Sequence, residues 1–323
     1  MNRREFVFGL GAVAVGSALP LGTIAEALEP RLYPPIDLSY FDTPITRAAA
    51  DIKFGYAAIT WGGRDLQAID DIAAVGFKGI QLRSNILAQF GERPAALRDI
   101  LDQHHLTMVA LSSGSVKIDP QLTQQVIAEH TSHAKFVRDV GGLYLQVTDD
   151  RPKDRPVVAA DYARLGRLMS EIGKRAADLG VPLGYHNHMN SLGEKPEEVD
   201  RILEAADPRY VKLELDVAHY HQGGGDPVKA IRRYHDRLLF MHIKDVESVP
   251  STTGDQAASY RFVELGRGKV DLKGVFAALQ DVKFRGWAIV ELDSVPDKTR
   301  TPKESALINK KYLEDLGLQI ADL

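Results

Sequence analysis

Short apolar stretches alternate with longer amphipathic stretches from Asp51 to the end of the chain. The apolar stretches have the length and the aliphatic content of strands that are buried on both faces of a parallel sheet. Sequential stretches of this kind predict eight strands. They are Ile52–Thr60, Gly79–Arg83, Thr107–Ser112, Leu143–Thr148, Pro182–His188, Val211–Asp216, Leu238–Lys244 and Trp287–Leu292.

The stretches between the strands repeat apolar residues at the three- and four-residue spacing of amphipathic helices. Several begin with proline, which costs no hydrogen bond in a first helical turn, and several end at glycine. Eight strand–helix units predict one closed (β/α)8 TIM barrel over residues 51–323. The predicted helices are Asp65–Val75, Pro94–Gln103, Pro120–Val140, Asp161–Leu179, Pro196–Ala205, Pro227–Tyr234, Leu272–Leu279 and Pro302–Leu316.

The N-terminus carries Arg3 and Arg4 before an apolar run that extends from Phe6 to about Leu21. The run is too short and too weakly apolar for a stable membrane anchor, and an ordinary apolar helix is the alternative. We interpret residues 1–28 as a twin-arginine export signal, which predicts a periplasmic protein. Residues 29–50 include a proline-rich stretch with little periodicity, which predicts a linker or arm.

Charge and composition narrow the class of function. The chain has 323 residues, 44% of them hydrophobic, and a net charge of -4 without a long basic cluster. Tight binding to a nucleic-acid backbone requires a basic surface, so we expect no nucleic-acid partner. The chain contains no Cys, which excludes disulfides and thiolate metal ligands.

Polar side chains gather at the ends of the late predicted strands. In a parallel barrel these ends open onto one face, where the chemistry takes place. Imidazole and carboxylate groups from neighbouring strand ends predict one bound divalent metal, preferably Mn²⁺, with Zn²⁺, Co²⁺, Fe²⁺ and Mg²⁺ as alternatives. The candidate ligands are His186, His188, Asp216, His242 and Glu291, and the choice between His186 and His188 stays open.

Two further residues near these ends are candidates for catalysis. Lys244 shares the face of His242, because residues two apart on a strand point the same way, and it can stabilise a developing enolate. His219 follows Asp216 by three residues, and it can ligate the metal, contact substrate or orient Asp216.

The segment after the seventh predicted strand, residues 247–268, is long and polar, as lids and binding loops are. Its glycines allow Glu264 to reach the substrate as a catalytic group and Arg267 to bind it, although Glu264 can equally be a solvated loop acid. Three earlier residues are weaker candidates for substrate binding: Gln81 and Arg83, which point together, and Trp61 as a platform for a sugar.

These parts predict a reaction. A divalent metal on a carbonyl and its neighbouring hydroxyl acidifies the C–H between them. A histidine, His186 or His188, or a carboxylate then removes the proton, and an enediolate results. Reprotonation gives an isomer or epimer, whereas loss of a β-substituent is the reaction of a lyase or dehydratase.

At these residues the chain resembles the sugar phosphate isomerase/epimerase superfamily, whose members have a xylose isomerase-like barrel. The family pattern is a Glu ending strand five, an Asp on strand six with a His three residues later, a His on strand seven and a Glu on strand eight. Asp216, His219, His242 and Glu291 match it, and His186 stands in place of the first Glu. The segment Tyr185–Met189 is similar to one in inosose dehydratase-like members.

The resemblance implies a metal-dependent isomerase or epimerase that acts on a carbohydrate. Export favours a non-phosphorylated sugar or keto-sugar. The replacement of a carboxylate by His186 favours the alternative, a β-eliminating lyase of a keto-sugar such as a 3-keto-glycoside. A barrel that binds sugar without catalysis is a second alternative, and a homo-oligomer is compatible with the sequence.

Overall fold

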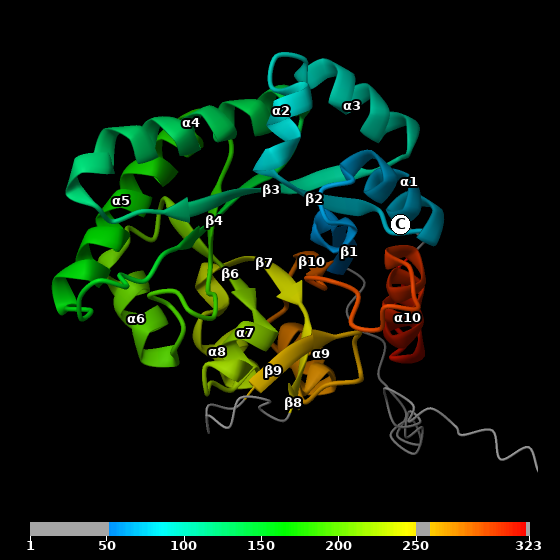
Figure 1. Cartoon of the computed structure of the whole chain (residues 1–323). Coiled ribbons are helices and arrows are strands. Elements are labelled where there is room, and N and C mark those ends of the chain that lie inside the picture. Colours follow the sequence, from blue (N-terminus) through cyan, green and yellow to red (C-terminus); the bar gives the residue numbers. More distant parts are fainter. Residues whose placement is uncertain (1–51, 250–258, 321–323) are drawn as a thin grey trace, which may run out of the picture. The chain divides into compact units, whose positions relative to one another are not determined.

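The computed structural model describes residues 52–249 and 259–320 (Figure 1). The predicted export signal and arm lie in residues 1–51, outside the described residues, so export and a periplasmic location stay predictions. Within the described ranges, every helix is too short or too polar to cross a membrane.

Eight parallel strands close into a barrel, which confirms the predicted (β/α)8 fold. Their order around the barrel is β1-β10-β7-β6-β5-β4-β3-β2, so β1 pairs with both β2 and β10. All eight predicted strands are present. They are β1 (Ile52–Ala57), β2 (Gly79–Arg83), β3 (Thr107–Val116), β4 (Tyr144–Asp149), β5 (Leu183–His186), β6 (Val211–Asp216), β7 (Leu238–Ile243) and β10 (Gly286–Val290).

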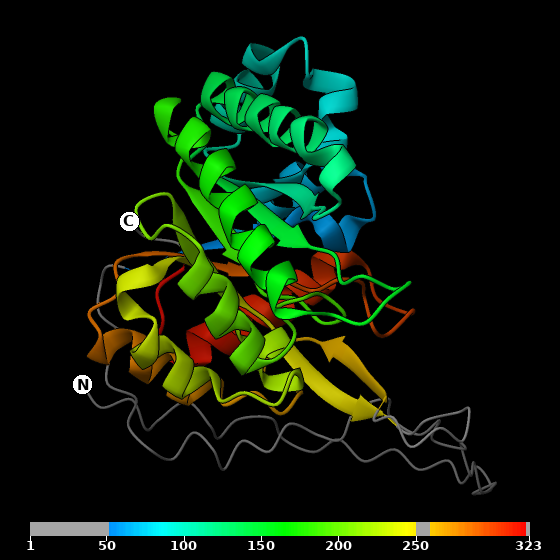
Figure 2. The ribbon, with the colours of Figure 1, turned by 90° about the vertical axis from the view of Figure 1, so that its left-hand side faces the viewer.

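Helices surround the barrel, as Figures 1 and 2 show. The predicted helices are all present to within a few residues. They are α1 (Asp65–Val75), α3 (Pro94–Gln103), α4 (Thr123–Val140), α5 (Ala159–Asp178), α6 (Pro196–Ala205), α8 (Pro227–Arg233), α9 (Leu272–Asp281) and α10 (Pro302–Asp315); the short α2 (Leu87–Phe90) and α7 (Val217–Gln222) were not predicted.

Four predicted strands end earlier than expected: β1, β5, β7 (at Ile243, not Lys244) and β10 (at Val290, not Leu292). For β1 and β5 the reasons lie in the backbone. The prediction to Thr60 is corrected because β1 passes at Ala57 into a 3₁₀ turn, Ala58–Trp61. The prediction to His188 is corrected because the Asn187 side chain pairs with the backbone of Asp216, accepting its N–H at 3.0 Å and donating to its carbonyl at 3.2 Å. This pairing ends β5 at His186.

The segment predicted as a long loop contains an antiparallel hairpin. Its strands are β8 (Asp245–Val249) and β9 (Ser259–Val263), while residues 250–258 lie outside the described ranges. Asp245 fixes the base of the hairpin, because its carboxylate accepts backbone N–H groups from Val246, Gly266, Gly268 and Val270. The hairpin extends from the barrel end that carries the candidate site (Figure 2).

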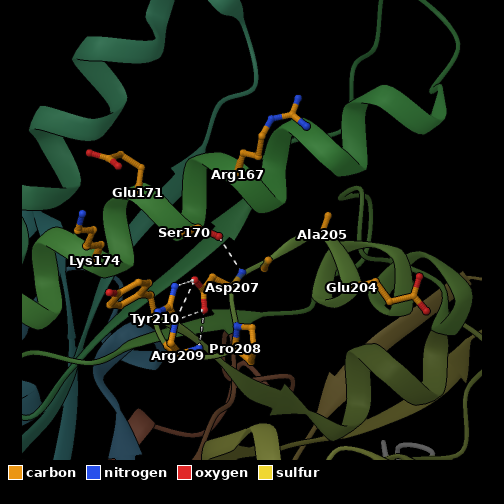
Figure 3. A pocket seen from close by; sticks show the side chains of 11 residues that line it. Arg167, Ser170, Glu171, Lys174, Glu204, Ala205, Asp207, Pro208, Arg209 and Tyr210 are labelled. Carbon is orange, nitrogen blue, oxygen red and sulfur yellow. Dashed lines mark hydrogen bonds and ion pairs between the residues drawn. The ribbon is translucent and has the colours of Figure 1, made fainter.

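Helix α5 approaches the chain between α6 and β6 at two of its glycines. A Cβ atom at Gly173 would lie 2.4 Å from the carbonyl oxygen of Tyr210, and one at Gly166 would lie 2.6 Å from Ala205. A surface groove of about 770 Å³ lies beside this contact, between the Arg167–Lys174 face of α5 and the segment 204–210 (Figure 3). Within it, Ser170 accepts a hydrogen bond from the Asp207 N–H at 2.9 Å.

We expect Gly173→Ala to destabilise the fold by about 1–3 kcal/mol, because the new methyl group meets backbone that cannot move without shifting β6. This cost exceeds the gain of about 1 kcal/mol that alanine brings inside a helix. Urea unfolding of the variant measures the effect, with the exposed Lys174→Ala on the same helix as control. A Gly173→Ala protein as stable as wild type would show that the contact is not tight.

Candidate functional site

Four buried polar side chains meet at the C-terminal ends of four barrel strands. His186 ends β5, Asp216 ends β6, His242 lies on β7, and Glu291 follows β10. The Nδ1 atom of His242 lies 3.6 Å from Oδ2 of Asp216 and 3.4 Å from Oε2 of Glu291. His186, Asp216 and Glu291 also offer ligand atoms within 4.8 Å of one another, in a group that includes His219.

The other ring nitrogen of His242 faces into the barrel. Its Nε2 lies 2.5 Å from Oε1 of Glu214 and 2.9 Å from Oε1 of Gln81, two acceptor oxygens. Nε2 therefore carries the proton, and in the neutral ring Nδ1 keeps its lone pair. Burial lowers the pKa of His242, but the carboxylates of Glu214 and Glu291 raise it more, to well above its ordinary value. The carboxylates of Glu214 and Glu291 therefore favour a positive charge at the His242 ring.

Asp216 divides its two oxygens between the fold and the site. Oδ1 caps helix α7 by accepting the N–H groups of Ala218 at 2.8 Å and His219 at 2.7 Å. Oδ2 is buried, turns toward His242 and has no hydrogen-bond partner. Burial raises the pKa of Asp216, but Lys244, His242 and His186 together outweigh it and hold the pKa of the carboxyl below its ordinary value.

This cluster fits a bound divalent metal. Asp216 Oδ2 and His242 Nδ1 are buried without a hydrogen-bond partner. His186 Nδ1 also has none, and it lies 3.7 Å from Oε1 of Glu214. Such atoms are costly unless something binds them. Two imidazoles and two carboxylates are ligands that Mn²⁺ and Zn²⁺ both accept. His186, Asp216, His242 and Glu291 are therefore the residues that would hold the ion.

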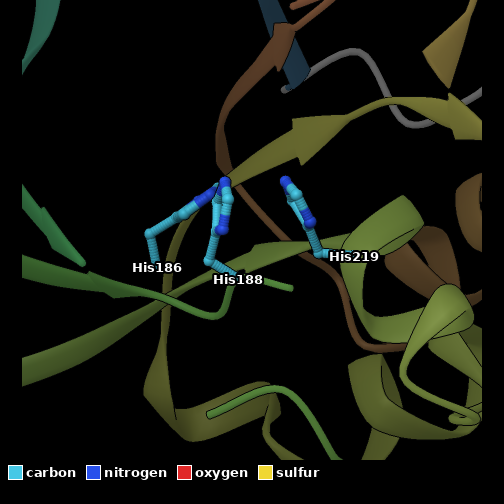
Figure 4. Close-up of side chains that lie close together, drawn as sticks. All are labelled: His186, His188 and His219. Carbon is cyan, nitrogen blue, oxygen red and sulfur yellow. The ribbon is translucent and has the colours of Figure 1, made fainter. Parts of the chain in front are cut away.

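The peptide groups of Met189 set the tautomers of two further histidines, His188 and His219. The Met189 carbonyl accepts the Nδ1–H of His188 at 2.7 Å, so Nε2 of His188 has a free lone pair. The Met189 N–H donates to Nδ1 of His219 at 3.1 Å, so the neutral ring carries its proton on Nε2, which lies 3.2 Å from Nζ of Lys244. The two rings lie 3.9 Å apart between centroids, and Figure 4 shows them close to His186. One ring presents an acceptor and the other a donor.

Both of these histidines are uncharged. Burial is the main cause that lowers the pKa of His188 and of His219, and Lys244 adds to the effect on His219. His219 belongs to one group of possible ligands with His186, Asp216 and Glu291, but in this tautomer its Nε2 cannot ligate a metal.

Lys244 is fully buried between the carboxylates and the hairpin. Its Nζ lies 2.9 Å from Oε1 of Glu291, 2.6 Å from Oδ1 of Asp293 and 3.9 Å from the centre of the Phe262 ring. Burial lowers the pKa of Lys244, but Glu291 and Asp293 raise it above its ordinary value. Lys244 is therefore a fixed positive charge next to the metal-binding cluster.

The loop that carries His188 and Met189 is held by Asp149, at the end of β4. Its carboxyl oxygens accept the hydroxyl of Tyr185 at 2.7 Å and the N–H of Leu192 at 2.5 Å. Burial raises the pKa of Asp149 to about 6.

This raised pKa predicts a pH-dependent stability. Between pH 3.8 and about 6 the folded chain holds a proton on Asp149 that the unfolded chain has lost, so stability falls as the pH rises through this window. About two pKa units correspond to about 3 kcal/mol. We expect Asp149→Asn to lack this part of the pH dependence, as measured by urea unfolding of both proteins at several pH values. Identical profiles would contradict the assignment.

Glu264, Arg267 and Trp61, which were also predicted as site residues, contact other side chains of the protein. Glu264 is buried at the end of the hairpin, where its Oε1 accepts from Arg300 at 2.9 Å and from Ser305 at 3.0 Å, and Arg267 lies 3.7 Å from its other oxygen. Trp61 is buried in the core and donates to Asp71 on α1 at 2.9 Å.

Gln81 and Arg83 occupy different environments on the same strand. Gln81 is buried and holds His242, whereas Arg83 is exposed at the end of β2. Contacts of Gln81, Arg83, Trp61, Glu264 and Arg267 with a substrate stay predictions.

Glu214 belongs to the site although the sequence analysis did not single it out. It is fully buried on β6 and lies two residues before Asp216, so the two-residue periodicity of a strand places both carboxylates inside the barrel. The two-residue spacing of Glu214 and Asp216 is the sequence signal that could have identified Glu214. Phe262 and Asp293 could not be assigned from the sequence, because their contacts with Lys244 depend on how the hairpin and the loop after β10 fold.

Comparison with known proteins relates the sequence of this chain to a family. A sequence model of the xylose isomerase-like TIM barrel family matches residues 69–313. The inosose dehydratase of Lacticaseibacillus casei is 28% identical over 293 residues, which cover 81% of this chain and 96% of the relative.

Solved structures show the same fold. The IolI protein with a bound zinc atom has a TM-score of 0.68 at 19% identity and aligns with 82% of this chain and 98% of its own. A D-tagatose 3-epimerase-like protein has a TM-score of 0.66 at 16% identity, covering 82% of this chain and 98% of its own.

Proposed function

The chain belongs to the xylose isomerase-like TIM barrel family, and we propose that this carbohydrate-modifying enzyme eliminates a β-substituent, water in the simplest case, from a keto-sugar or a keto-cyclitol with the help of a divalent metal. The observation that carries the proposal is the pair of opposite tautomers that Met189 sets in His188 and His219. Elimination needs both a base and an acid, and this pair supplies them at neutral charge.

His186, Asp216, His242 and Glu291 would hold the metal, with Glu214 orienting His242. His186, Asp216 and Glu291 offer ligand atoms within 4.8 Å of one another, and Nδ1 of His242 lies beside the two carboxylates. When bound, such an ion polarises a substrate carbonyl and acidifies the neighbouring C–H. Mn²⁺ and Zn²⁺ both suit these donors.

The chain's own residues then move two protons. His188 Nε2 takes the proton α to the carbonyl, and the electrons of the C–H bond form an enolate. As the enolate collapses, a C=C bond forms and the bond to the β-oxygen breaks. His219 Nε2 gives its proton to the departing oxygen, so hydroxide leaves as water, and the Lys244 ammonium, 3.2 Å from Nε2, replaces that proton. Lys244 balances the negative charge that develops on the substrate.

Isomerisation or epimerisation of a ketose is the second candidate, because it passes through the same type of proton abstraction. The fold shared with an epimerase-like protein is compatible with it. His186 argues against isomerisation or epimerisation. It lies at the end of β5, where the family pattern that the sequence resembles has a glutamate. Dehydratase relatives that align over most of both chains favour elimination.

Chromatography coupled to mass spectrometry distinguishes the two reactions, because an epimer has the mass of its substrate but a different retention time. The metal-loaded enzyme is incubated with free ketoses, keto-cyclitols and 3-keto-glycosides. We expect a product that has lost water or the glycosidic substituent. A product of unchanged mass with altered stereochemistry would establish the epimerase, and the absence of turnover with metal fully bound would favour a barrel that only binds sugar.

A further inference from the structure

A cavity lies at the opposite end of the barrel from the candidate active site. It has a volume of about 360 Å³ and lies against the N-terminal ends of the strands and the end of the described chain. The lining residues are Lys53, Phe54, Lys78, His105, Thr107, Trp287, Gln319 and Ile320. Lys53 and Trp287 are register partners near the start of β1 and β10.

The charge of this cavity is one-sided. Its ionisable lining residues are Lys53, Lys78 and His105, and no carboxylate is among the described lining residues. Within the described ranges none of these three side chains forms an ion pair or a hydrogen bond; Lys53 lies over the Trp287 ring, 5.7 Å from its centre. The chain as a whole has a net charge of -4, so the described lining of this cavity, with Lys53, Lys78 and His105 exposed, is more basic than the chain as a whole.

Trp287 gives the cavity an aromatic wall. Its indole belongs to the apolar cluster inside the barrel and is 7% exposed. The ring lies directly against Gly79, where a Cβ atom would stand 2.4 Å from the ring carbon Cζ3. Gly79 therefore makes room for the indole at this position.

His105 reaches the rim through an unusual backbone. It lies just beyond the end of α3 with φ 53°, in the left-handed region, where a side chain costs about 1–2 kcal/mol. The Leu106 N–H donates to the Leu101 carbonyl at 2.9 Å, which closes the turn in the way usual for a glycine. A glycine at this position would relieve the strain and remove the imidazole.

We propose that this cavity binds a small organic anion that carries a flat apolar ring, such as an aryl phosphate. The ring packs on Trp287, and the anionic group meets Lys53, Lys78 and His105. The site is separate from the metal cluster, so its occupation does not depend on the proposed reaction.

Tryptophan fluorescence tests this proposal directly, because the chain contains two Trp residues and Trp61→Phe leaves Trp287 as the single reporter. Phenyl phosphate is titrated into this variant, with inorganic phosphate and phenol as separate probes of the charge and of the ring. We expect saturable binding of phenyl phosphate, at least about tenfold tighter than that of either partial probe.

Lys53→Ala, Lys78→Ala and His105→Gly in the same background should each weaken this binding, about tenfold for the lysines. His105→Gly should do so while keeping or raising the unfolding temperature, which a purely structural role would not predict. Lys174→Ala, an exposed lysine elsewhere, is the control. If Trp61→Phe does not fold, the thermal shift that phenyl phosphate causes in the wild type, and its loss in Lys53→Ala, replaces fluorescence. No saturable signal, or a signal that the cavity variants leave unchanged, overturns the proposal.

Discussion

Asp216→Ala is expected to remove the bound metal and to lower kcat by at least about 1,000-fold. Asp216 supplies one of the two carboxylates of the cluster, and its Oδ2 is buried with no other partner. Loss of the metal removes several kcal/mol of stabilisation from the transition state. Metal per chain, measured by inductively coupled plasma mass spectrometry after dialysis, checks the first part, and turnover of the active keto-sugar checks the second.

The same substitution removes the cap of α7, which costs about 1 kcal/mol of stability. Asp216→Asn is the matched control, because asparagine caps a helix as well as aspartate does but lacks the negative charge. In the absence of metal we expect the Asn variant, which keeps the cap, to be more stable than Asp216→Ala, and we still expect it to bind metal much more weakly than the wild type. Full metal content in Asp216→Ala and in His242→Ala would contradict the assignment of the cluster.

His188→Asn and His219→Gln are each expected to lower kcat by about 100- to 10,000-fold, the usual contribution of a general base or acid. In contrast to Asp216→Ala, both variants should retain metal, since neither residue belongs to the four that we assign to it. Steady-state kinetics together with metal content separates the two groups of residues. A metal-free His188→Asn protein would make His188 a ligand and not the base.

The barrel was predictable because the residues that begin and end its helices act locally in the sequence. The first and last residues of α1, α3 and α6 follow from Pro94, Pro196, Gly76 and the apolar spacing, and the structure has the predicted boundaries. The convergence of His186, Asp216, His242 and Glu291 follows from the parallel arrangement of the strands alone.

The separate roles of the site residues as proton acceptor, proton donor and fixed charge were not predictable from residue types. The acceptor and donor roles of His188 and His219 depend on the N–H and carbonyl groups of Met189, and so on the path of the backbone after β5. The role of Lys244 likewise depends on Phe262, which lies on β9, and on Asp293, which lies in the loop after β10. Apart from the bond between His188 and the neighbouring Met189, these contacts are long-range, and no spacing in the sequence encodes them.

Exchange of the α-proton in heavy water tests the acid–base assignment most directly. The metal-loaded wild type, His188→Asn and His219→Gln are incubated with the keto-sugar in heavy water, and the deuterium content of the recovered substrate is followed by mass spectrometry. We predict that His219→Gln exchanges the α-proton without eliminating, since the base remains and the acid is lost, and that His188→Asn neither exchanges nor eliminates. Exchange in His188→Asn at the wild-type rate would contradict the account, because another group would then remove the proton.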